Sequence, residues 1–538
     1  MKKIIVLLMA AVMSLGLVFA GCSQSNTHYE NNLDGLTGTV DSNGGFVVAK
    51  GDYVYFINGV AANTDDNTFG KPVTGSLVRI KKSDLPNAAD RTKAAVEAET
   101  VIPSLFVAGD LTSGFYMFNE SNNVYFASPY TGKNKAGEIE NSKLSFTRAT
   151  LNGKEKTVIV TVDDNATAYR FAEKDGTVYL MLKTTVKDER SDDETATRAA
   201  IVVYNADNGE KIFTSEKVGE YDFGEGTDIY YTVTPYDEDL EQEEKYNELF
   251  RYDLGAKEAV LVASGKGSEL NGSDAKTGEG LSGATYSIIE NANDALYVKV
   301  TYVDTSVATV TQYRAYGKPD GKADGENKEI LNYGSETASK VFANTSYFAS
   351  KNCIVYLDST YGLLAYRYQS NDSKYNGDPV VDKTATLFYD KDLVGYTVRF
   401  WNDGYVYLTD SDNYYYRVKV IGNLINEDGT EPKNIAENVK ATKVEKVNFL
   451  ANSTTWYLPE VIGNYFFSVY TASPYNSLVY VSDMNANAAL EDDKIEEIKK
   501  SEKESVEANL STCISKVSEE IKKSIEEYIK DTFESEEG

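Results

Sequence analysis

One short phrase, a turn followed by a burst of aliphatic and aromatic residues, returns along most of this chain of 538 residues. Clear copies are Asp175-Gly176-Thr177-Val178-Tyr179-Leu180 and Asp403-Gly404-Tyr405-Val406-Tyr407-Leu408. We count eight copies, which begin at Gly51, Asn123, Asp175, Thr227, Asn293, Cys353, Asp403 and Gly463. Their central aromatic residues lie about 51 to 70 residues apart, and repetition at such a period indicates repeated supersecondary units.

Each copy is flanked by further strand-like segments. Upstream partners include the segments 46–49, 169–172 and 396–400. The downstream partners often end in an aliphatic or aromatic residue followed by arginine, at Val78-Arg79, Phe250-Arg251, Tyr313-Arg314, Tyr366-Arg367 and Tyr416-Arg417. Asp-Gly pairs between strands suit tight hairpins because their backbones tolerate a positive φ. The pattern therefore predicts at least three consecutive antiparallel strands in every repeat.

This organisation predicts an all-β domain over residues 44–487. Radial arrays of short antiparallel sheets are β-propellers, so the sequence favours a propeller of about seven or eight blades. The 40 tyrosines agree, because half-buried pleated surfaces favour them. The repeat resembles the Tyr-rich, propeller-like repeat domains of exported Firmicutes proteins. Two smaller propellers and a pair of β-sandwiches are the alternatives.

The N-terminus carries an export pattern. Met1-Lys2-Lys3 precedes an uncharged apolar run from Ile4 to Phe19, and Ala20-Gly21 then leads to Cys22. This segment resembles a bacterial lipoprotein signal, although leucine is typical at the position of Phe19. The resemblance implies cleavage of a signal peptide of residues 1–21, a lipid such as palmitate on Cys22, and a polar tether over residues 22–43. The mature protein would then face the exterior from the outer side of the cell membrane. The alternative is an ordinary cleaved signal peptide.

Composition excludes several function classes. The formal net charge of −29 repels phosphate backbones, so we expect no nucleic-acid partner. The single histidine, His28, lies in the predicted tether, which argues against histidine-dependent catalysis and zinc sites. No nucleotide-binding motif is present. The segment 320–326 suggests a calcium loop, but Lys322 and Leu331 occupy positions that need oxygen ligands. We expect no cofactor and no metal.

The remaining candidate features have simple structural explanations. Cys353 lies in a predicted strand and Cys513 near the C-terminus, and we expect both to be free thiols. Trp401 and Trp456 could stack on sugars, but packing in or beside strands is the better interpretation. The charge-dense segments 187–194 and 237–245 are expected to be solvated hairpin loops. The same applies to the turn 410–413.

After Asn487 the composition changes to Glu, Lys and Ser without Gly or Pro until residue 533. Apolar residues spaced three or four apart predict a long amphipathic helix over residues 488–538. Its stripe is narrow, as in a coiled coil, so we expect it to mediate an interaction such as self-association. The alternative is a frayed, charged tail that packs weakly or not at all. The seam would consist of Leu510, Ile514, Val517, Ile521, Ile525 and Tyr528.

These features together predict a non-enzymatic, membrane-anchored binding or scaffold protein. Its propeller-face loops would recognise a protein or a glycan. The first alternative is a glycoside hydrolase or polysaccharide-cleaving enzyme, which needs only two carboxylates, but no pair can be chosen among 83 acidic residues. The second alternative, a solute-binding lipoprotein of a transporter, would need βαβ alternation, which the sequence lacks before residue 490.

Overall fold

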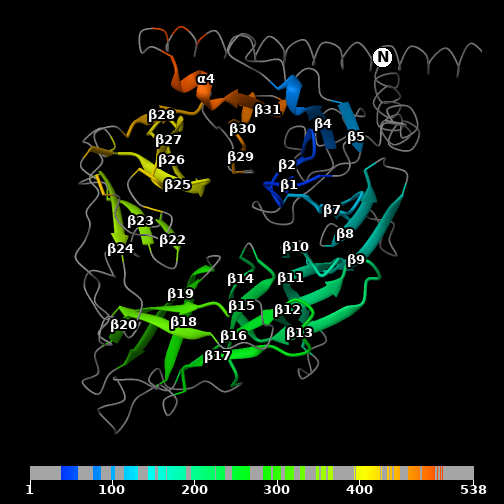
Figure 1. Ribbon diagram of the computed structural model, residues 1–538. Helices are drawn as coiled ribbons and strands as arrows, with labels where there is room; N and C mark the ends of the chain where they lie inside the picture. Colours follow the sequence, from blue (N-terminus) through cyan, green and yellow to red (C-terminus); the bar gives the residue numbers. More distant parts are fainter. Residues whose placement is uncertain are drawn as a thin grey trace, which may run out of the picture. The chain divides into compact units, whose positions relative to one another are not determined.

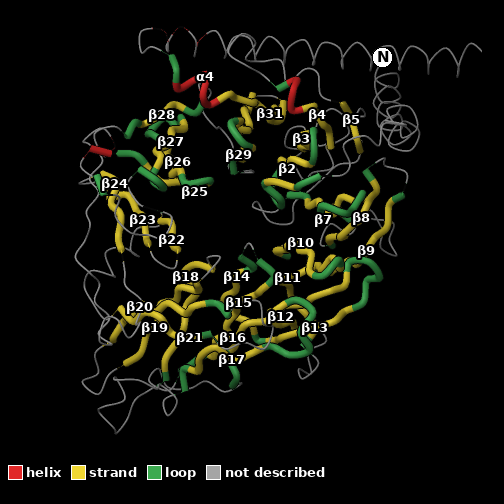
Figure 2. Tube along the Cα trace, in the orientation of Figure 1, coloured by secondary structure: helices red, strands yellow, loops and turns green. Residues whose placement is uncertain are grey.

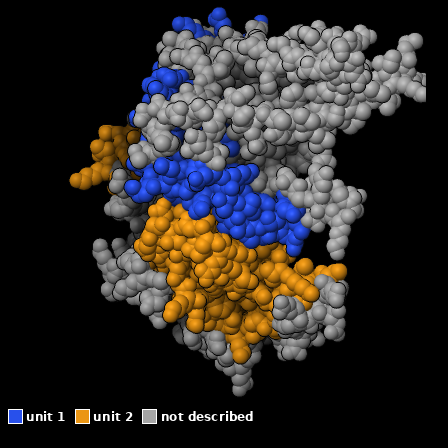
Figure 3. All heavy atoms as spheres, turned by 90° about the vertical axis from the view of Figure 1, so that its right-hand side faces the viewer, with its two compact units in different colours: residues 1–165, 412–415, 445–538 blue, residues 166–411, 416–444 orange. Residues whose placement is uncertain are grey.

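The computed structural model describes slightly more than half of the chain. The described residues are 38–57, 77–85, 99–102, 114–130, 143–151, 155–164, 167–188, 195–224, 226–236, 245–266, 283–291, 295–303, 309–319, 327–333, 347–350, 353–358, 362–367, 393, 395–423, 426, 433–434, 437–438, 442–448, 458–472, 475–490, 494, 497 and 500. They form two compact units, which Figure 3 colours blue and orange. Unit 1 comprises residues 1–165, 412–415 and 445–538, and unit 2 comprises residues 166–411 and 416–444.

Unit 1 contains three antiparallel sheets (Figure 1). Their strands are β1 (Val40–Asp41), β2 (Val47–Lys50), β3 (Tyr53–Ile57), β4 (Leu77–Lys81) and β5 (Glu99–Ile102); β6 (Tyr116–Met117), β7 (Asn123–Pro129), β8 (Leu144–Thr150) and β9 (Lys156–Val162); and β29 (Glu460–Ile462), β30 (Tyr465–Ala472) and β31 (Tyr475–Asp483). A 3-10 turn, η2 (Lys82–Asp84), follows β4, and the helix α4 (Met484–Ala488) follows β31.

Unit 2 repeats the same plan, and strands dominate it in Figure 2. Its sheets consist of β10 (Ala168–Lys174), β11 (Thr177–Lys187), β12 (Thr197–Asn205) and β13 (Lys211–Glu216); β14 (Val218–Asp222), β15 (Asp228–Val233), β16 (Glu248–Asp253) and β17 (Val260–Ser264); β18 (Ala284–Asn291), β19 (Ala295–Val303), β20 (Thr309–Gly317) and β21 (Lys328–Tyr333); and β22 (Tyr347–Ser350), β23 (Cys353–Asp358) and β24 (Gly362–Arg367).

An eighth sheet has most of its residues in unit 2. It contains β25 (Thr397–Asn402), β26 (Tyr405–Thr409), β27 (Tyr415–Lys419) and β28 (Val444–Lys446). In all eight sheets of the described part, the strands follow one another in sequence order. The predicted all-β class is therefore confirmed, and each of the eight repeated phrases marks one sheet.

The repeated phrase has a constant position within the sheet. It forms the second strand of seven sheets, from β7 to β30, and the third strand of the first sheet because β1 precedes β2 there. The predicted Asp-Gly hairpins are confirmed, since both residues of Asp175-Gly176 and of Asp403-Gly404 have positive φ angles, between 45° and 76°. The recurrent arginine lies in the strand that follows the phrase, as predicted, but only β24 ends at it, and β4, β16, β20 and β27 continue two or three residues beyond it.

A β-bulge recurs between the last two strands of the four- and five-stranded sheets. Five of these sheets shift register there, and each shift leaves one extra residue in the outer strand. The extra residues are all β-branched and aliphatic: Val101, Ile159, Ile212, Val262 and Ile330. A bulge increases the local twist and turns the outer edge away from pairing. The repeat therefore protects its exposed edges in the same way each time.

Apolar side chains fill the space between neighbouring sheets within each unit. In unit 1 one cluster joins residues of β2–β5 to Phe115 and Met117 and to Phe467, Val479 and Val481 of the last sheet. Within it, the rings of Phe56 and Phe467 lie 6.2 Å apart between centroids. Unit 2 has matching clusters on both sides of the β14–β17 sheet. Within the described residues, no strand of one sheet pairs with a strand of another. Side-chain packing between sheets therefore contributes to holding each unit together.

The recurrent arginines are buried. Arg79, Arg251, Arg314 and Arg417 are at most 6% exposed. The guanidinium of Arg79 lies 4.1 Å from the ring centroid of Tyr53, and that of Arg417 lies 4.6 Å from Tyr405. Cation–π contact with the aromatic residue of the neighbouring strand stabilises the desolvated charge. The aromatic phrase and the arginine signal in the sequence are thus two halves of one packing motif.

The ends of the predicted domains differ in detail from the structure. The pairing of β1 with β2 begins at Val40, within the segment predicted as tether. At the other end the strands stop at Asp483, whose carboxylate caps α4 by accepting from the backbone N–H groups of Asn485 (3.0 Å) and Ala486 (3.1 Å). Of the predicted helix over residues 488–538, the structure describes residues 488–490, where α4 ends, and Lys494, Glu497 and Lys500, whose backbone is helical. The proposed seam from Leu510 to Tyr528 lies outside the described residues.

Candidate functional site

In each described sheet the strand that carries the repeated phrase follows its upstream partner through a short connection, as at Asp175-Gly176 between β10 and β11, and we call this end of the sheet the turn end. At the opposite end, the loop end, the phrase strand leads into the next strand, through connections that range from residues 473–474 between β30 and β31 to residues 58–76 between β3 and β4. The predicted charged loops 187–194 and 237–245 both belong to loop ends, although the structure describes only Lys187, Asp188 and Lys245 of them.

The loop end of the β25–β27 sheet carries an aromatic pair beside a carboxylate. Tyr396 precedes β25 and Tyr416 lies in β27, and their rings make an edge-to-face contact with centroids 5.2 Å apart. The hydroxyl of Tyr416 donates to Asp410 Oδ2 over 3.0 Å, just after the end of β26. All three side chains are half-buried. Burial, with the Asp410 carboxylate and Tyr396 next to it, raises the pKa of Tyr416 well above its usual value.

We call Tyr396, Asp410 and Tyr416 the Tyr396 cluster. A further polar contact lies at the same end of the sheet. Arg399 is exposed on β25, and its Nε donates to Thr409 Oγ1 over 2.8 Å. Gly395, before Tyr396, is exposed, and an added Cβ there would meet no atom within 4 Å. A partly exposed aromatic ring with a carboxylate near it can stack on an apolar face and exchange hydrogen bonds with hydroxyl groups.

A second aromatic pair lies at the loop end of the β14–β17 sheet. Tyr236 follows β15 and Tyr246 precedes β16, and their ring centroids are 5.3 Å apart with planes tilted by 45°. Both side chains are half-buried. The pair forms the base of the charged loop 237–245. No sequence signal distinguishes these two tyrosines, which lie just outside the strands, from the rest of the 40 tyrosines in the chain.

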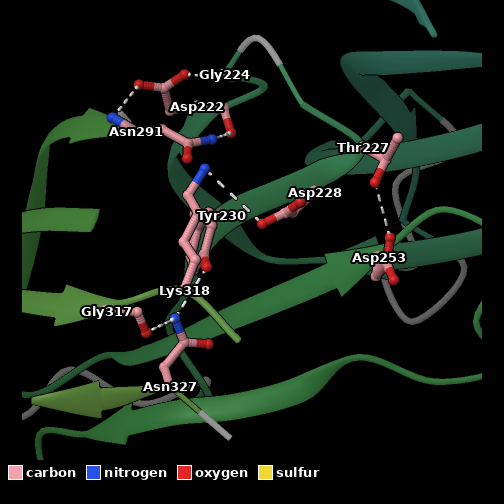
Figure 4. A network of polar contacts seen from close by, with 10 residues as sticks. All are labelled: Asp222, Gly224, Thr227, Asp228, Tyr230, Asp253, Asn291, Gly317, Lys318 and Asn327. Carbon is pink, nitrogen blue, oxygen red and sulfur yellow. Dashed lines mark hydrogen bonds and ion pairs between the residues drawn. The ribbon is translucent and has the colours of Figure 1, made fainter. Parts of the chain in front are cut away.

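The turn ends are joined by hydrogen bonds between neighbouring sheets (Figure 4). Asp222, at the end of β14, accepts from the backbone N–H of Gly224 (2.7 Å) and from that of Asn291 (3.2 Å), while Asn291 Nδ2 donates to the Asp222 carbonyl (3.2 Å). Gly224 has φ +58°, and a Cβ there would lie 2.4 Å from Asn291 Nδ2. The close approach of β14 to β18 therefore depends on that glycine.

Similar contacts recur at two other turn ends. Lys174, at the end of β10, reaches Asp253 Oδ2 of β16 over 2.6 Å. In unit 1, Lys50 at the end of β2 donates to the carbonyl oxygens of Phe118 (2.6 Å) and Ser121. In all three cases the last residue of the strand before the repeated phrase extends to the next sheet. These residues are structural, since each one joins two sheets.

In Figure 4, Tyr230 lies below the Asp222 contact, at the centre of a second set of polar contacts. Its hydroxyl accepts from Asn327 Nδ2 over 2.9 Å, and Lys318 Nζ lies 5.5 Å from its ring centroid and 3.8 Å from Asp228 Oδ2. Tyr230 is fully buried, and this burial raises the pKa of its hydroxyl far above the usual value. Without access to a ligand, this group also has a structural role.

Unit 1 has one carboxyl group with an unusual environment. Ser42 Oγ donates to Glu460 Oε2 over 2.6 Å, a contact between residues 418 positions apart. Burial, with the charge of Asp41 nearby, raises the pKa of Glu460 to about 8, while the Ser42 hydrogen bond opposes that shift. Glu460 therefore holds a proton at neutral pH. Carboxyl groups that are protonated at working pH are candidates for general acids.

The sequence-predicted features have mixed outcomes. Cys22, His28, Trp456 and Cys513 lie outside the described residues, as does the whole segment 320–326. Trp401 lies half-buried in β25 and Cys353 begins β23, both as predicted. Within the described residues no group of three or more His, Cys, Asp or Glu side chains could hold a metal ion, and no helix is long and apolar enough to span a membrane.

Comparison with known proteins gives fold-level likeness only. No family model matches the chain, and no curated protein sequence matches it. Among solved structures, it is similar to the β-propeller domain of the Trilobed protease from Pyrococcus furiosus, with 10% identity, coverage of 83% of this chain and 98% of that one, and a TM-score of 0.34.

Two other similar structures are enzymes. An acylaminoacyl peptidase from Pyrococcus horikoshii has 11% identity over 69% of this chain and 52% of its own, with a TM-score of 0.29. A glycoside hydrolase family 43 arabinoxylan arabinofuranohydrolase from Bacillus subtilis has 10% identity over 85% and 94%, with a TM-score of 0.21. These scores are low, and we draw no argument about activity from them.

Proposed function

We propose that this chain is a lipid-anchored extracellular binding protein that recognises an uncharged polysaccharide through the loop ends of its sheets. The observation that carries the proposal is the Tyr396 cluster, where an aromatic pair, a carboxylate and the nearby Arg399 share one loop end. Sugar rings present apolar faces that stack on aromatic rings and hydroxyl groups that bind carboxylates and guanidinium groups. Because the chain carries a net charge of −29, anionic polymers are disfavoured as ligands.

The cellular setting of the proposal comes from the sequence. The signal-like segment that ends at Cys22 supports a lipid anchor and an external location. The eight consecutive sheets support one propeller of eight blades as the body that presents the loops. The apolar seam of the C-terminal segment, from Leu510 to Tyr528, supports self-association, which would increase avidity for a repetitive polymer. A transporter-type solute-binding protein is disfavoured, since the described sheets contain no βαβ alternation.

The test is binding of the whole chain to immobilised uncharged glycans, with anionic glycans and bacterial surface proteins in parallel. We expect retention on the uncharged glycans, and we expect Tyr396→Ala to weaken it about tenfold, the loss expected for one stacking contact. Tyr221→Ala is the matched control, because Tyr221 is half-buried and packs against Phe223 (5.1 Å) at a turn end. Retention only on a surface protein, or equal loss in both variants, contradicts the glycan proposal.

A second candidate function has its own supporting observation. Glu460, whose pKa burial raises to about 8, lies near Asp41, and carbohydrate-cleaving enzymes use two carboxyl groups, one of them as an acid. In that case the protein would release reducing ends from a glycan, and both Glu460→Gln and Asp41→Asn would abolish the release. Binding without any release of reducing ends leaves the binding protein as the function.

A further inference from the structure

The segment from Ser42 to Gly45 runs between two other sheets of unit 1. On one side, Gly44 N donates to the Phe115 carbonyl (3.1 Å) and Phe115 N donates to the Gly45 carbonyl (3.0 Å), next to β6. On the other side, Ser42 binds Glu460 at the start of β29. The segment therefore connects the first sheet to the second and to the last.

The Glu460 carboxyl packs directly on the backbone. An added Cβ at Gly45 would lie 1.6 Å from Glu460 Oε1, so the carboxyl occupies the place of a side chain. On the opposite side of the same peptide, a Cβ at Gly114 would lie 1.7 Å from the Gly45 carbonyl oxygen. Ser42 itself has φ +57°, a conformation that non-glycine residues adopt at a cost. The hydrogen bond to Glu460 holds Ser42 in this conformation.

Few groups near Glu460 can stabilise a negative charge. On the packed elements, β1 contributes Asp41 and β2 contributes Lys50, whose ammonium group is already bound to the carbonyl oxygens of Phe118 and Ser121. β6 contributes Tyr116, which lies against Gly44. The partner of Glu460 on β30 is Phe467, which is apolar and buried. The Ser42 hydroxyl is the donor that meets the carboxyl.

We infer that the Glu460 carboxyl, packed against Gly45 and bound by Ser42, is a proton-dependent latch, which holds the β1–β5 sheet against the β29–β31 sheet when Glu460 is protonated and loosens when its packed carboxyl ionises. The proton goes from the Glu460 carboxyl to water or to a buffer base, and no other bond changes. The charged carboxylate then needs water, which the close packing against Gly45 excludes. No strand of the first described sheet pairs with the last one, so this junction depends on side chains.

The direction of the pH dependence follows from linkage. The raised pKa of about 8 means that folded Glu460 keeps its proton at pH values where the unfolded chain has already lost it. Protonation thus favours the closed junction, whose stability is highest below the unfolded pKa, near 4.5, and falls as the pH rises through about 8. The latch therefore opens when the pH becomes alkaline.

The test is hydrogen–deuterium exchange of the whole chain at pH 6, 7.5 and 9, corrected for intrinsic exchange rates. Peptides that cover residues 42–57 and 460–472 should exchange about tenfold faster at pH 9 than at pH 6, after allowance for the partial exposure of Glu460. In Glu460→Gln the same peptides should show no such change. The matched control is Glu216→Gln, which removes a half-exposed carboxylate that pairs with Arg198 in unit 2.

Ser42→Ala provides a second measurement if Glu460→Gln does not fold. Its hydroxyl favours the ionised carboxylate, so its loss should move the midpoint of the pH transition to higher pH. The latch is wrong if the two wild-type segments change with pH no more than the other sheets do. It is also wrong if Glu460→Gln keeps the pH dependence or if Ser42→Ala leaves the midpoint in place.

Discussion

Two junctions between neighbouring sheets, one in each unit, use a carboxyl group in opposite ways. In unit 2, Asp222 accepts from two backbone N–H groups, those of Gly224 and Asn291. In unit 1, Glu460 accepts from one hydroxyl, that of Ser42. Two backbone N–H groups bind the Asp222 carboxyl oxygens, whereas Glu460 is buried, has one hydroxyl donor and lies near Asp41, so its pKa is raised to about 8. Burial above all, which the single Ser42 hydrogen bond only partly opposes, makes Glu460 more stable with a proton.

Glycines also lie at or next to both junctions, and the largest effect should come from Gly114, which packs against the segment 42–45 of unit 1 and has no room to adjust. A Cβ at Gly114 would lie 1.7 Å from the Gly45 carbonyl oxygen, which is backbone and cannot move alone. We expect Gly114→Ala to lower the free energy of unfolding by about 3 kcal/mol or more. Gly176→Ala is the control, because it has φ +76° but meets no atom within 4 Å, and should cost only about 1 to 2 kcal/mol. Denaturant unfolding of both variants gives the comparison, and equal losses would contradict it.

The next largest effect should come from the Asp222 junction in unit 2. In Asp222→Asn the side chain has one acceptor oxygen, so one of two backbone N–H groups loses its partner and faces an NH2 group instead. We expect a loss of about 2 kcal/mol in the free energy of unfolding. Asp52→Asn is the control, since Asp52 is exposed at a hairpin turn and should change little. A loss no greater than that of the control would show that Asp222 does not hold the sheets together.

The same carboxyl-to-amide change should have the opposite sign at the other junction. At pH 9 the wild type carries a charge on Glu460, whereas Glu460→Gln carries none and retains an acceptor for Ser42. We expect this variant to be more stable than the wild type by about 1 kcal/mol at pH 9, with the gain reduced by partial solvent exposure, and to show no gain at pH 5. Thermal melting at the two pH values measures the difference. A gain of equal size at both pH values would exclude proton linkage as its cause.

The sequence predicted the repeat far better than the junctions. The second strand of each sheet was identifiable because it combines a turn with a buried alternation of aromatic and aliphatic residues, as in Thr177–Leu180, and these signals are local. Glu460, Asp222 and Asn291 have no local signal, because their partners lie 418 or 69 positions away and many other acidic and amide residues look the same. Asp410 was predicted as part of a turn, and only the fold brings Tyr396 and Tyr416 to it.

The smallest effect should come from Tyr230, deep in the unit 2 junction. Its hydroxyl accepts from Asn327 Nδ2 (2.9 Å), which also donates to the Gly317 carbonyl (3.3 Å). Tyr230→Phe removes one neutral hydrogen bond and leaves Asn327 its other acceptor, so we expect a loss of about 1 kcal/mol. A double-mutant cycle with Asn327→Ala separates the hydrogen bond from packing, since the two losses should add to more than the loss of the double variant. If the losses of the two single variants add up to the loss of the double variant, the Tyr230 hydroxyl and Asn327 do not interact. Tyr230 would then stabilise the junction through its ring alone, and the two carboxyl groups would be the remaining polar difference between the junctions of the two units.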